Sequence, residues 1–129
     1  MIVVDSSVWI DFLNGVRSAE VERLLQLLGR QPLLVGDIIL LEVLQGIRNE
    51  AEATRVEAGL RRFSVEPMLD AELAVVAARH YRRLRSAGIT VRKTIDLVIG
   101  TFCIVRGHSL LTSDRDFRPM AEHLGLRLA

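Results

Sequence analysis

The chain has 129 residues and a formal net charge of +1, half of its residues are apolar, and about a quarter are charged. This length suits one domain with a buried core, so we expect residues 1–129 to form a single domain. The nearly balanced charge excludes binding to nucleic acid or membranes through net charge alone. A single cysteine, Cys103, excludes an intrachain disulfide and favours a cytoplasmic location.

Short apolar runs alternate along the chain with segments of helical periodicity. The runs at residues 2–4, 32–36 and 109–112 predict buried strands, and residues 63–66 and 125–128 predict weaker ones. Short strands separated by helices indicate an α/β protein with a parallel, helix-covered sheet. The longest apolar region, residues 33–44, contains two acids and a glycine and is therefore not expected to span a membrane. Ser18 and Asp37 are expected to cap two helices, and Thr94 or a near neighbour a third. Further helices are expected to begin near Ser6–Val8, near Asn49, and at Met68 or Asp70.

Two acidic residues come directly after expected strands. Asp5 follows the run 2–4, and Asp114 follows the run 109–112. Ligands bind outside the carboxyl ends of strands in open α/β sheets, which makes both residues candidates for a site. Either could instead only cap a helix, because Asp is a favoured N-cap residue. Asp116, two residues further on, is either a second ligand or a solvated acid.

Two more acidic residues lie on helices that are otherwise apolar. Glu42 is flanked by Leu41 and Val43 on a helix that is apolar nearly all round and is therefore expected to be buried on all sides. A lone charge on a buried helix is costly unless it is paired or bound to a metal. The alternative for Glu42 is an ion pair with an arginine in the core. Asp96 lies in the first turn of an apolar helix, where the helix dipole alone could also account for it.

All four acids can converge on one crevice at the edge of the sheet. Like charges about 4 Å apart repel by about 4 kcal/mol per pair at an effective dielectric constant near 20, so such a group requires a cation. Oxygen ligands without His or Cys favour a hard ion, Mg²⁺ or Mn²⁺. The chemistry that follows from this ion is hydrolysis of a phosphodiester bond.

The order and spacing of these motifs resemble the PIN-domain ribonucleases, in particular the VapC-type toxins of toxin–antitoxin pairs. The resemblance rests on four segments, residues 4–10, 40–43, 94–100 and 111–117, and covers essentially the whole chain. It implies a three-layer α/β/α sandwich around a short-stranded parallel sheet. It also implies an Mg²⁺-dependent endoribonuclease that forms a homodimer and is held inactive by a cognate VapB-type antitoxin.

The resemblance also assigns roles to individual residues. It implies four catalytic acids, of which Asp5 and Asp96 would hold the metal directly while the other two bind or orient its waters. Whether Asp114 or Asp116 is the fourth acid stays open. Thr112 matches the family's hydroxyl residue, and Arg92 and Lys93, just ahead of the Asp96 helix, are expected to meet RNA phosphate unless they belong to a solvated loop. The candidate site therefore comprises Asp5, Glu42, Asp96, Asp114, Asp116, Thr112, Arg92 and Lys93.

Two other functions remain open from the sequence. A phospho-acceptor receiver domain has a similar length and an acidic Mg²⁺ pocket, but it requires paired acids after the first strand and a lysine after a late strand. A PIN module that binds RNA without cutting it would retain the same acids. The three histidines lack the spacing of metal ligands, and we do not expect them to bind a metal.

Overall fold

The computed structural model describes residues 1–129, and five parallel strands at its centre form one sheet. The strand order is β3-β2-β1-β4-β5, so the first strand of the chain lies in the middle. β1 is paired on one side with a strand that follows soon after it and on the other with a strand more than 100 residues later. The strands are β1 (Ile2–Val4), β2 (Leu33–Gly36), β3 (Ser64–Glu66), β4 (Ser109–Leu111) and β5 (Arg127–Leu128).

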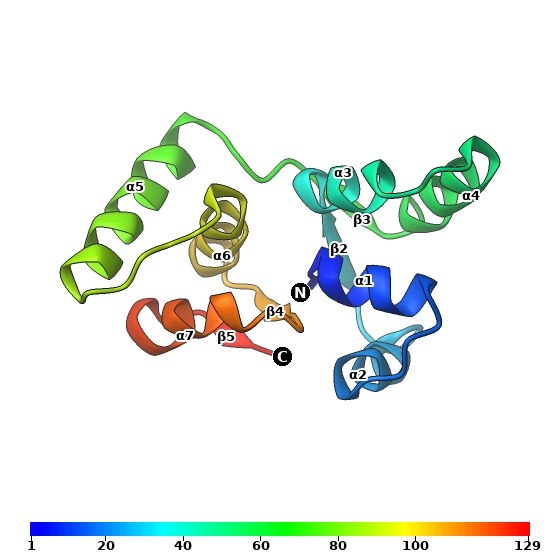
Figure 1. Ribbon diagram of the computed structural model, residues 1–129, viewed down its shortest axis with the longest axis horizontal. Coiled ribbons are helices and arrows are strands. Elements are labelled where there is room, and N and C mark those ends of the chain that lie inside the picture. Colours follow the sequence, from blue (N-terminus) through cyan, green and yellow to red (C-terminus); the bar gives the residue numbers. More distant parts are fainter.

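The helices cover the two faces of this sheet in two groups. In Figure 1 the helices α1 to α4 lie on one side of the strands, and α5 to α7 lie on the other. Since β2 and β3 lie on one side of β1 and β4 and β5 on the other, right-handed crossovers place the two groups on opposite faces. The predicted three-layer α/β/α fold is therefore confirmed. The helices are α1 (Ser6–Leu13), α2 (Ala19–Leu27), α3 (Asp37–Gln45), α4 (Glu50–Leu60), α5 (Ala71–Ser86), α6 (Thr94–Arg106) and α7 (Arg118–Leu124), with a 3₁₀ turn η1 (Arg115–Phe117) before α7.

Three of the predicted helix starts are confirmed by their hydrogen bonds. The side chains of Ser18, Asn49 and Asp70 accept bonds from backbone N–H groups three residues later, at 3.1, 3.0 and 2.8 Å. The prediction that Asp37 caps α3 is wrong, because the helix already begins at this residue. Its carboxylate instead accepts a bond from the backbone N–H of Met68 at 3.0 Å and so ties the segment after β3 to the start of α3.

The expectation that α3 is buried on all sides is also wrong. Leu41 is 58% exposed, and Glu42 is only partly buried. The buried face of α3 consists of Ile39 and Val43, four residues apart, as on an ordinary amphipathic helix. The second face, with Glu42, is therefore open to the crevice and to solvent.

The α5–α7 layer contains one helix that the apolar pattern did not predict. α7 has seven residues, too few for a clear helical period, and Pro119 stands in its first turn. Its buried Met120 packs against α6 at Gly100, where a Cβ atom would lie 2.3 Å from the methionine methyl group. Cys103 is fully buried on α6, and burial raises its thiol pKa to about 12, which agrees with the expected packing role. None of the helices is long and apolar enough to span a membrane.

Candidate active site

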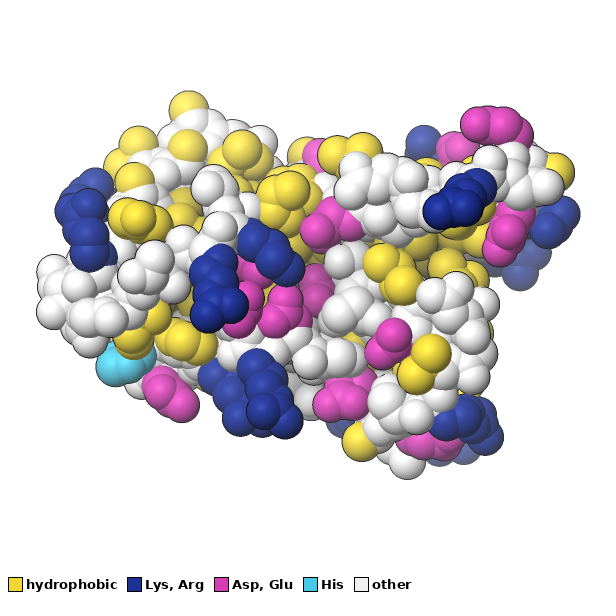
Figure 2. All heavy atoms as spheres, in the orientation of Figure 1, with side chains coloured by type: hydrophobic (Ala, Val, Ile, Leu, Met, Phe, Trp, Pro, Cys, Tyr) yellow, Lys and Arg dark blue, Asp and Glu magenta, His cyan; other side chains and the backbone are white.

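The predicted acidic residues lie in a hollow between the two groups of helices, at the carboxyl ends of the strands. Asp5 follows β1, α3 with Glu42 follows β2, and Asp114 follows β4 after two residues. The N-terminal turn of α6 brings Asp96 to the same edge. Figure 2 shows acidic side chains gathered in this hollow, with basic side chains beside them.

Asp5 is a buried carboxylate, 4% exposed, that is held by two side-chain hydroxyls. Ser7 Oγ donates a hydrogen bond to Asp5 Oδ2 at 2.7 Å, and Thr112 Oγ1 donates to the same oxygen at 3.0 Å. The carboxylate makes no cap bond to α1, so the interpretation of Asp5 as only a helix cap is not supported. Burial raises its pKa, and the two hydroxyl bonds oppose part of that increase.

Thr112 links the first and the last of the predicted acids. While its hydroxyl donates to Asp5, the same oxygen accepts a bond from the backbone N–H of Asp114 at 3.0 Å. Ser7 makes a second link across the same gap, because its hydroxyl accepts from the backbone N–H of Ser113 at 3.1 Å. These bonds fix the end of β1 against the loop that follows β4.

Glu42 reaches into the crevice from α3. Ser6 Oγ donates to Glu42 Oε1 at 3.1 Å. Burial is the largest cause of its raised pKa, and the charges of Asp5 and Asp114 contribute to the increase. No arginine forms an ion pair with Glu42, so the alternative of a core ion pair does not apply.

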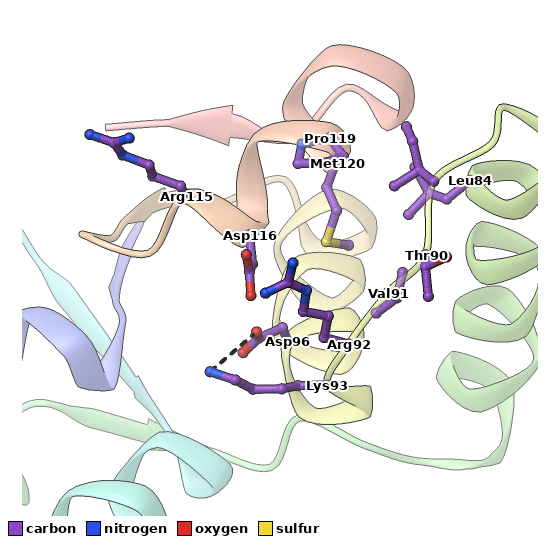
Figure 3. Close-up of a pocket in the computed structure, with 11 residues that line it drawn as sticks. Leu84, Thr90, Val91, Arg92, Lys93, Asp96, Arg115, Asp116, Pro119 and Met120 are labelled. Carbon is purple, nitrogen blue, oxygen red and sulfur yellow. Dashed lines mark ion pairs between the residues drawn. The ribbon is translucent and has the colours of Figure 1, made fainter.

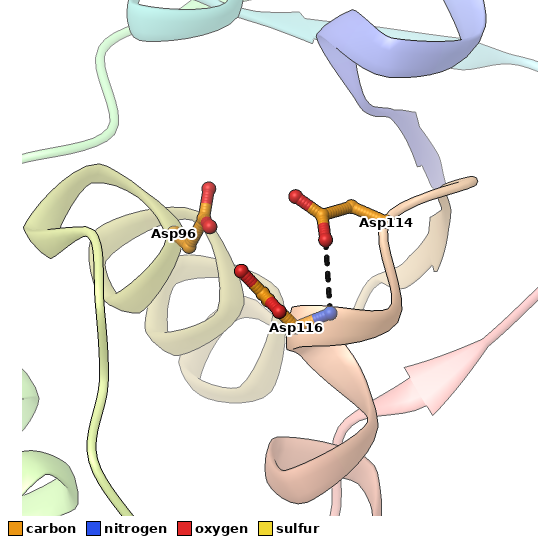
Figure 4. A group of neighbouring side chains, drawn as sticks. All are labelled: Asp96, Asp114 and Asp116. Carbon is orange, nitrogen blue, oxygen red and sulfur yellow. Dashed lines mark hydrogen bonds between the residues drawn. The ribbon is translucent and has the colours of Figure 1, made fainter.

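Three carboxylates lie close enough together to bind one cation. Oxygen atoms of Asp96, Asp114 and Asp116 are all within 4.8 Å of one another, and Figure 4 shows the three side chains pointing toward a common space. Asp114 Oδ1 accepts a hydrogen bond from the backbone N–H of Asp116 at 2.9 Å, so Asp114 also caps η1 as one interpretation predicted. Both members of the last acidic pair therefore belong to this cluster.

Asp96 is the most perturbed acid of the group. It is 7% exposed, and its Oδ2 atom is buried without a hydrogen-bond partner. Burial, followed by the charges of neighbouring acids, raises its pKa to about 6, although Lys93 opposes the increase. A dipole effect at the start of α6 does not explain a buried oxygen without a partner.

The predicted basic residues line one wall of the hollow. Lys93 Nζ lies 3.6 Å from Asp114 Oδ2 and 4.0 Å from Asp96 Oδ2, and these two acids raise the pKa of the lysine. Arg92, Lys93, Asp96 and Asp116 line a cavity of about 190 Å³. Figure 3 shows Arg92 extending above Lys93 toward the acids.

The structure adds three residues that sequence reasoning did not assign to the site. Ser6 and Ser7 donate hydrogen bonds that hold Glu42 and Asp5. Arg115, between the last two acids, lines both the cavity beside Lys93 and a second hollow that includes Thr112 and Asp114. A signal for the serines was present, since two hydroxyls directly follow a strand-end acid at the predicted ligand edge.

The donor set fits a hard divalent cation. The three residues of the cluster offer only carboxylate oxygens, and Asp96 contributes a buried oxygen that accepts no hydrogen bond. Such an atom is costly unless a cation or water reaches it. Asp5 and Glu42 are not among the three closest carboxylates, but their charges raise the pKa of Asp96 and therefore act on the same site.

Comparisons with known proteins agree with this arrangement. A family model described as the PIN domain matches residues 2–123. Ribonuclease VapC11 of Mycobacterium tuberculosis (strain ATCC 25618 / H37Rv) is 28% identical over 134 residues, which cover 100% of this chain and 98% of that protein. VapBC2 from Rickettsia felis, solved bound to a DNA fragment from its promoter, aligns with a TM-score of 0.78 at 16% identity, covering 100% of this chain and 98% of that one. A toxin–antitoxin complex from Klebsiella pneumoniae aligns with a TM-score of 0.71 at 18% identity, covering 91% and 90% of the two chains.

Proposed function

The chain belongs to the PIN domain family, and from this premise we propose that it is an endoribonuclease that hydrolyses RNA phosphodiester bonds with a bound Mg²⁺ ion. The observation that carries the proposal is the cluster of Asp96, Asp114 and Asp116, with its buried and unpartnered Asp96 oxygen. Ribonuclease relatives that match over the full chain support the same activity. Mn²⁺ is expected to substitute, because it accepts the same oxygen ligands.

The residues divide the work by their contacts. Asp96, Asp114 and Asp116 would hold the ion, Asp5 would add its charge from the end of β1, and Glu42 would orient water from α3. When bound, the ion supplies a Lewis acid beside the scissile phosphate and lowers the pKa of a water molecule. The Thr112 hydroxyl holds Asp5 and the loop with Asp114 in fixed relative positions. We propose that Thr112 contributes to substrate binding through this positioning. Arg92 and Lys93 meet the phosphates on the open side of the cavity.

We further propose that the protein is the toxin of a toxin–antitoxin pair in the cytoplasm and that it forms a homodimer. Relatives and structural neighbours described as VapC ribonucleases, VapBC and toxin–antitoxin complexes support this assignment. The chain also offers an apolar hollow of about 300 Å³ for a partner segment. It lies beside the buried Trp9 ring and is lined by Phe12, Leu60 and Phe63 among others.

The receiver-domain alternative finds no support in the fold. Its lysine should follow a late strand, whereas Lys93 precedes α6 as the helix N-cap. The binding-only PIN module keeps the same fold and the same acids, so only an assay separates it from the enzyme.

The test is cleavage of total cellular RNA by purified protein free of antitoxin. Discrete fragments are expected with Mg²⁺, and none with EDTA or with Asp96→Asn. Asp70→Asn is the matched control, because it makes the same chemical change at an exposed helix cap where Asn also caps well. Equal cutting by Asp96→Asn would assign the activity to a contaminant, and absence of cutting by wild type in every condition would favour the binding-only module.

A further inference from the structure

The only lysine of the chain lies against the oxygens that a cation would use. Lys93 Nζ approaches Asp114 Oδ2 at 3.6 Å and Asp96 Oδ2 at 4.0 Å. The other oxygen of Asp114 is already engaged by the Asp116 backbone N–H, and Asp96 Oδ2 has no hydrogen-bond partner. The ammonium therefore faces one oxygen of Asp114 and one of Asp96, neither of which accepts a hydrogen bond from the protein.

We propose that Lys93 is an internal counter-ion that competes with the divalent cation for these oxygens and is released when the cation binds. The inference rests on the proposed function in one respect, that the cluster of Asp96, Asp114 and Asp116 is a cation site. It goes further by stating that either the Lys93 ammonium or a divalent ion occupies that site. One of them is part of the chain.

Electrostatics requires the exchange. A divalent ion binds carboxylate oxygens at about 2.1 Å, which would place it within a few ångströms of the lysine nitrogen. Like charges at that separation repel strongly at the effective dielectric constant of a protein surface. The two cations therefore compete for Asp96 and Asp114, and the repulsion favours withdrawal of the ammonium when the divalent ion binds.

The chemistry of lysine suits an exchangeable cation. The Lys93 side chain is 60% exposed, so its flexible stem can withdraw into solvent. An arginine would bind carboxylates through a planar fork and would be harder to displace. The other 16 basic residues of the chain are arginines, and the one lysine stands at the one place where a point charge on a mobile stem is useful.

Release of Lys93 links cation binding to substrate binding. Arg92 lines the same cavity, so a freed ammonium joins it on the open side of the acidic cluster (Figure 3). The freed ammonium then adds a basic group, beside Arg92, that an RNA phosphate can contact. The divalent ion is thus expected to raise RNA affinity, and RNA to raise affinity for the ion by the same factor.

The test compares divalent-cation affinity among variants of the full chain by titration calorimetry with Mn²⁺. Lys93→Met, which keeps the stem and removes the charge, is expected to bind Mn²⁺ about three- to tenfold more tightly than wild type. Arg92→Met is the matched control, because it removes one positive charge from the adjacent residue, which forms no ion pair with the cluster. It is expected to change the affinity less than about twofold. Unchanged or weaker binding by Lys93→Met, or equal tightening in both variants, would overturn the proposal.

A second measurement follows the lysine itself. Reductive methylation with ¹³C-formaldehyde labels only Lys93 and the amino group of Met1. The Met1 amino group is hydrogen-bonded to His108 Nδ1 at 3.0 Å and is not part of the acidic cluster. Saturating Mg²⁺ is expected to shift the Lys93 NMR signal and to leave the Met1 signal in place. If the Lys93 signal does not move in a protein that is shown to bind Mg²⁺, the proposed exchange is wrong but the cation site stands. Absence of divalent-cation binding in both wild type and Lys93→Met would overturn the cation site and the inference together.

Discussion

Asp5 and Asp96 are both buried carboxylates in the same hollow, yet their surroundings are opposite. Asp5 accepts hydrogen bonds from Ser7 and Thr112 on one oxygen, whereas Asp96 Oδ2 accepts none. The first is satisfied by neutral donors of the protein. The negative charge of Asp96 is balanced only by the ammonium of Lys93, which lies on a mobile side chain 4.0 Å away.

This difference indicates that Asp5 and Asp96 have different roles in the acidic site. A carboxylate fixed by hydroxyl donors keeps its position whether or not a cation is present. A carboxylate left without donors is unstable alone and gains most from a cation. We therefore expect Asp5 to define the geometry of the site and Asp96 to provide most of its affinity for metal.

Asp96→Asn should separate the two residues most clearly. We expect it to reduce RNA cleavage on the order of a thousandfold, because the charge that holds the cation is lost. In EDTA at pH 7 it should raise the free energy of unfolding, by up to about 3 kcal/mol, because a buried charge with a pKa near 6 is replaced by a neutral amide. Thermal and denaturant unfolding measure the second effect.

Asp5→Asn tests whether Asp5 and Asp96 differ in the way that their hydrogen bonds predict. It should also lose cleavage, but its stability should stay within about 1 kcal/mol of wild type, because an amide oxygen still accepts bonds from Ser7 and Thr112. Equal stabilisation by the two variants would mean that the hydroxyl donors do not distinguish Asp5 from Asp96.

Thr112→Val tests whether the hydroxyl bonds hold Asp5 in place. Loss of the donor to Asp5 and of the acceptor for the Asp114 N–H should lower stability by about 1–3 kcal/mol and cleavage by about 10–100-fold. Thr112→Ser keeps the hydroxyl and should restore most of both. If the serine variant behaves like the valine variant, the methyl group and its packing are responsible instead.

The pH dependence of stability sharpens the comparison further. In EDTA the folded state holds the Asp96 proton up to about pH 6, whereas the unfolded chain loses it near pH 3.8. The folded state thus binds more protons between these values, and the stability of wild type should fall as pH rises from about 4 to about 6.

Subtracting the Asp96→Asn profile isolates this group. The excess stability of the variant should be small near pH 4, grow through the same window and level off above about pH 7. The midpoint of thermal unfolding, measured at several pH values, checks this. A difference between the two proteins that is constant with pH would show that burial does not perturb Asp96.

The sequence predicted β1, β2 and β4 because these strands are short and apolar and are followed by an acid or a turn residue, whereas β3 and β5 contain polar residues and have a weaker pattern. The predicted strands 2–4 and 109–112 match β1 and, to within one residue, β4, because Asp5 and Ser113–Asp114 end the apolar runs. α7 could not be predicted, because its packing depends on Met120 meeting the gap left by Gly100. That contact joins segments 20 residues apart and has no local signature.

The acids of the site were predictable for a local reason, and their partners were not. Asp5 and Asp114 follow strands, Glu42 and Asp96 interrupt apolar helices, and both patterns can be seen in the chain itself. The pairing of Lys93 with Asp114 depends on where α6 and η1 meet in space. The choice among Asp5, Glu42 and Asp116 as members of the closest cluster likewise depends on side-chain directions that spacing does not encode.

The central place of β1 in the sheet has a consequence for biosynthesis. β1 leaves the ribosome first, but one of its two neighbours, β4, is made more than 100 residues later, and Asp5 donates its own backbone N–H to Leu111 at 2.9 Å. Pairings this distant in sequence form late. A nascent chain that has reached only α6 already carries Asp5, Glu42 and Asp96, yet it lacks Thr112 and Asp114, which complete the hollow. An RNA-cleaving protein built in this order cannot attack its own messenger during most of translation, because its first and last acids meet only when synthesis is nearly finished.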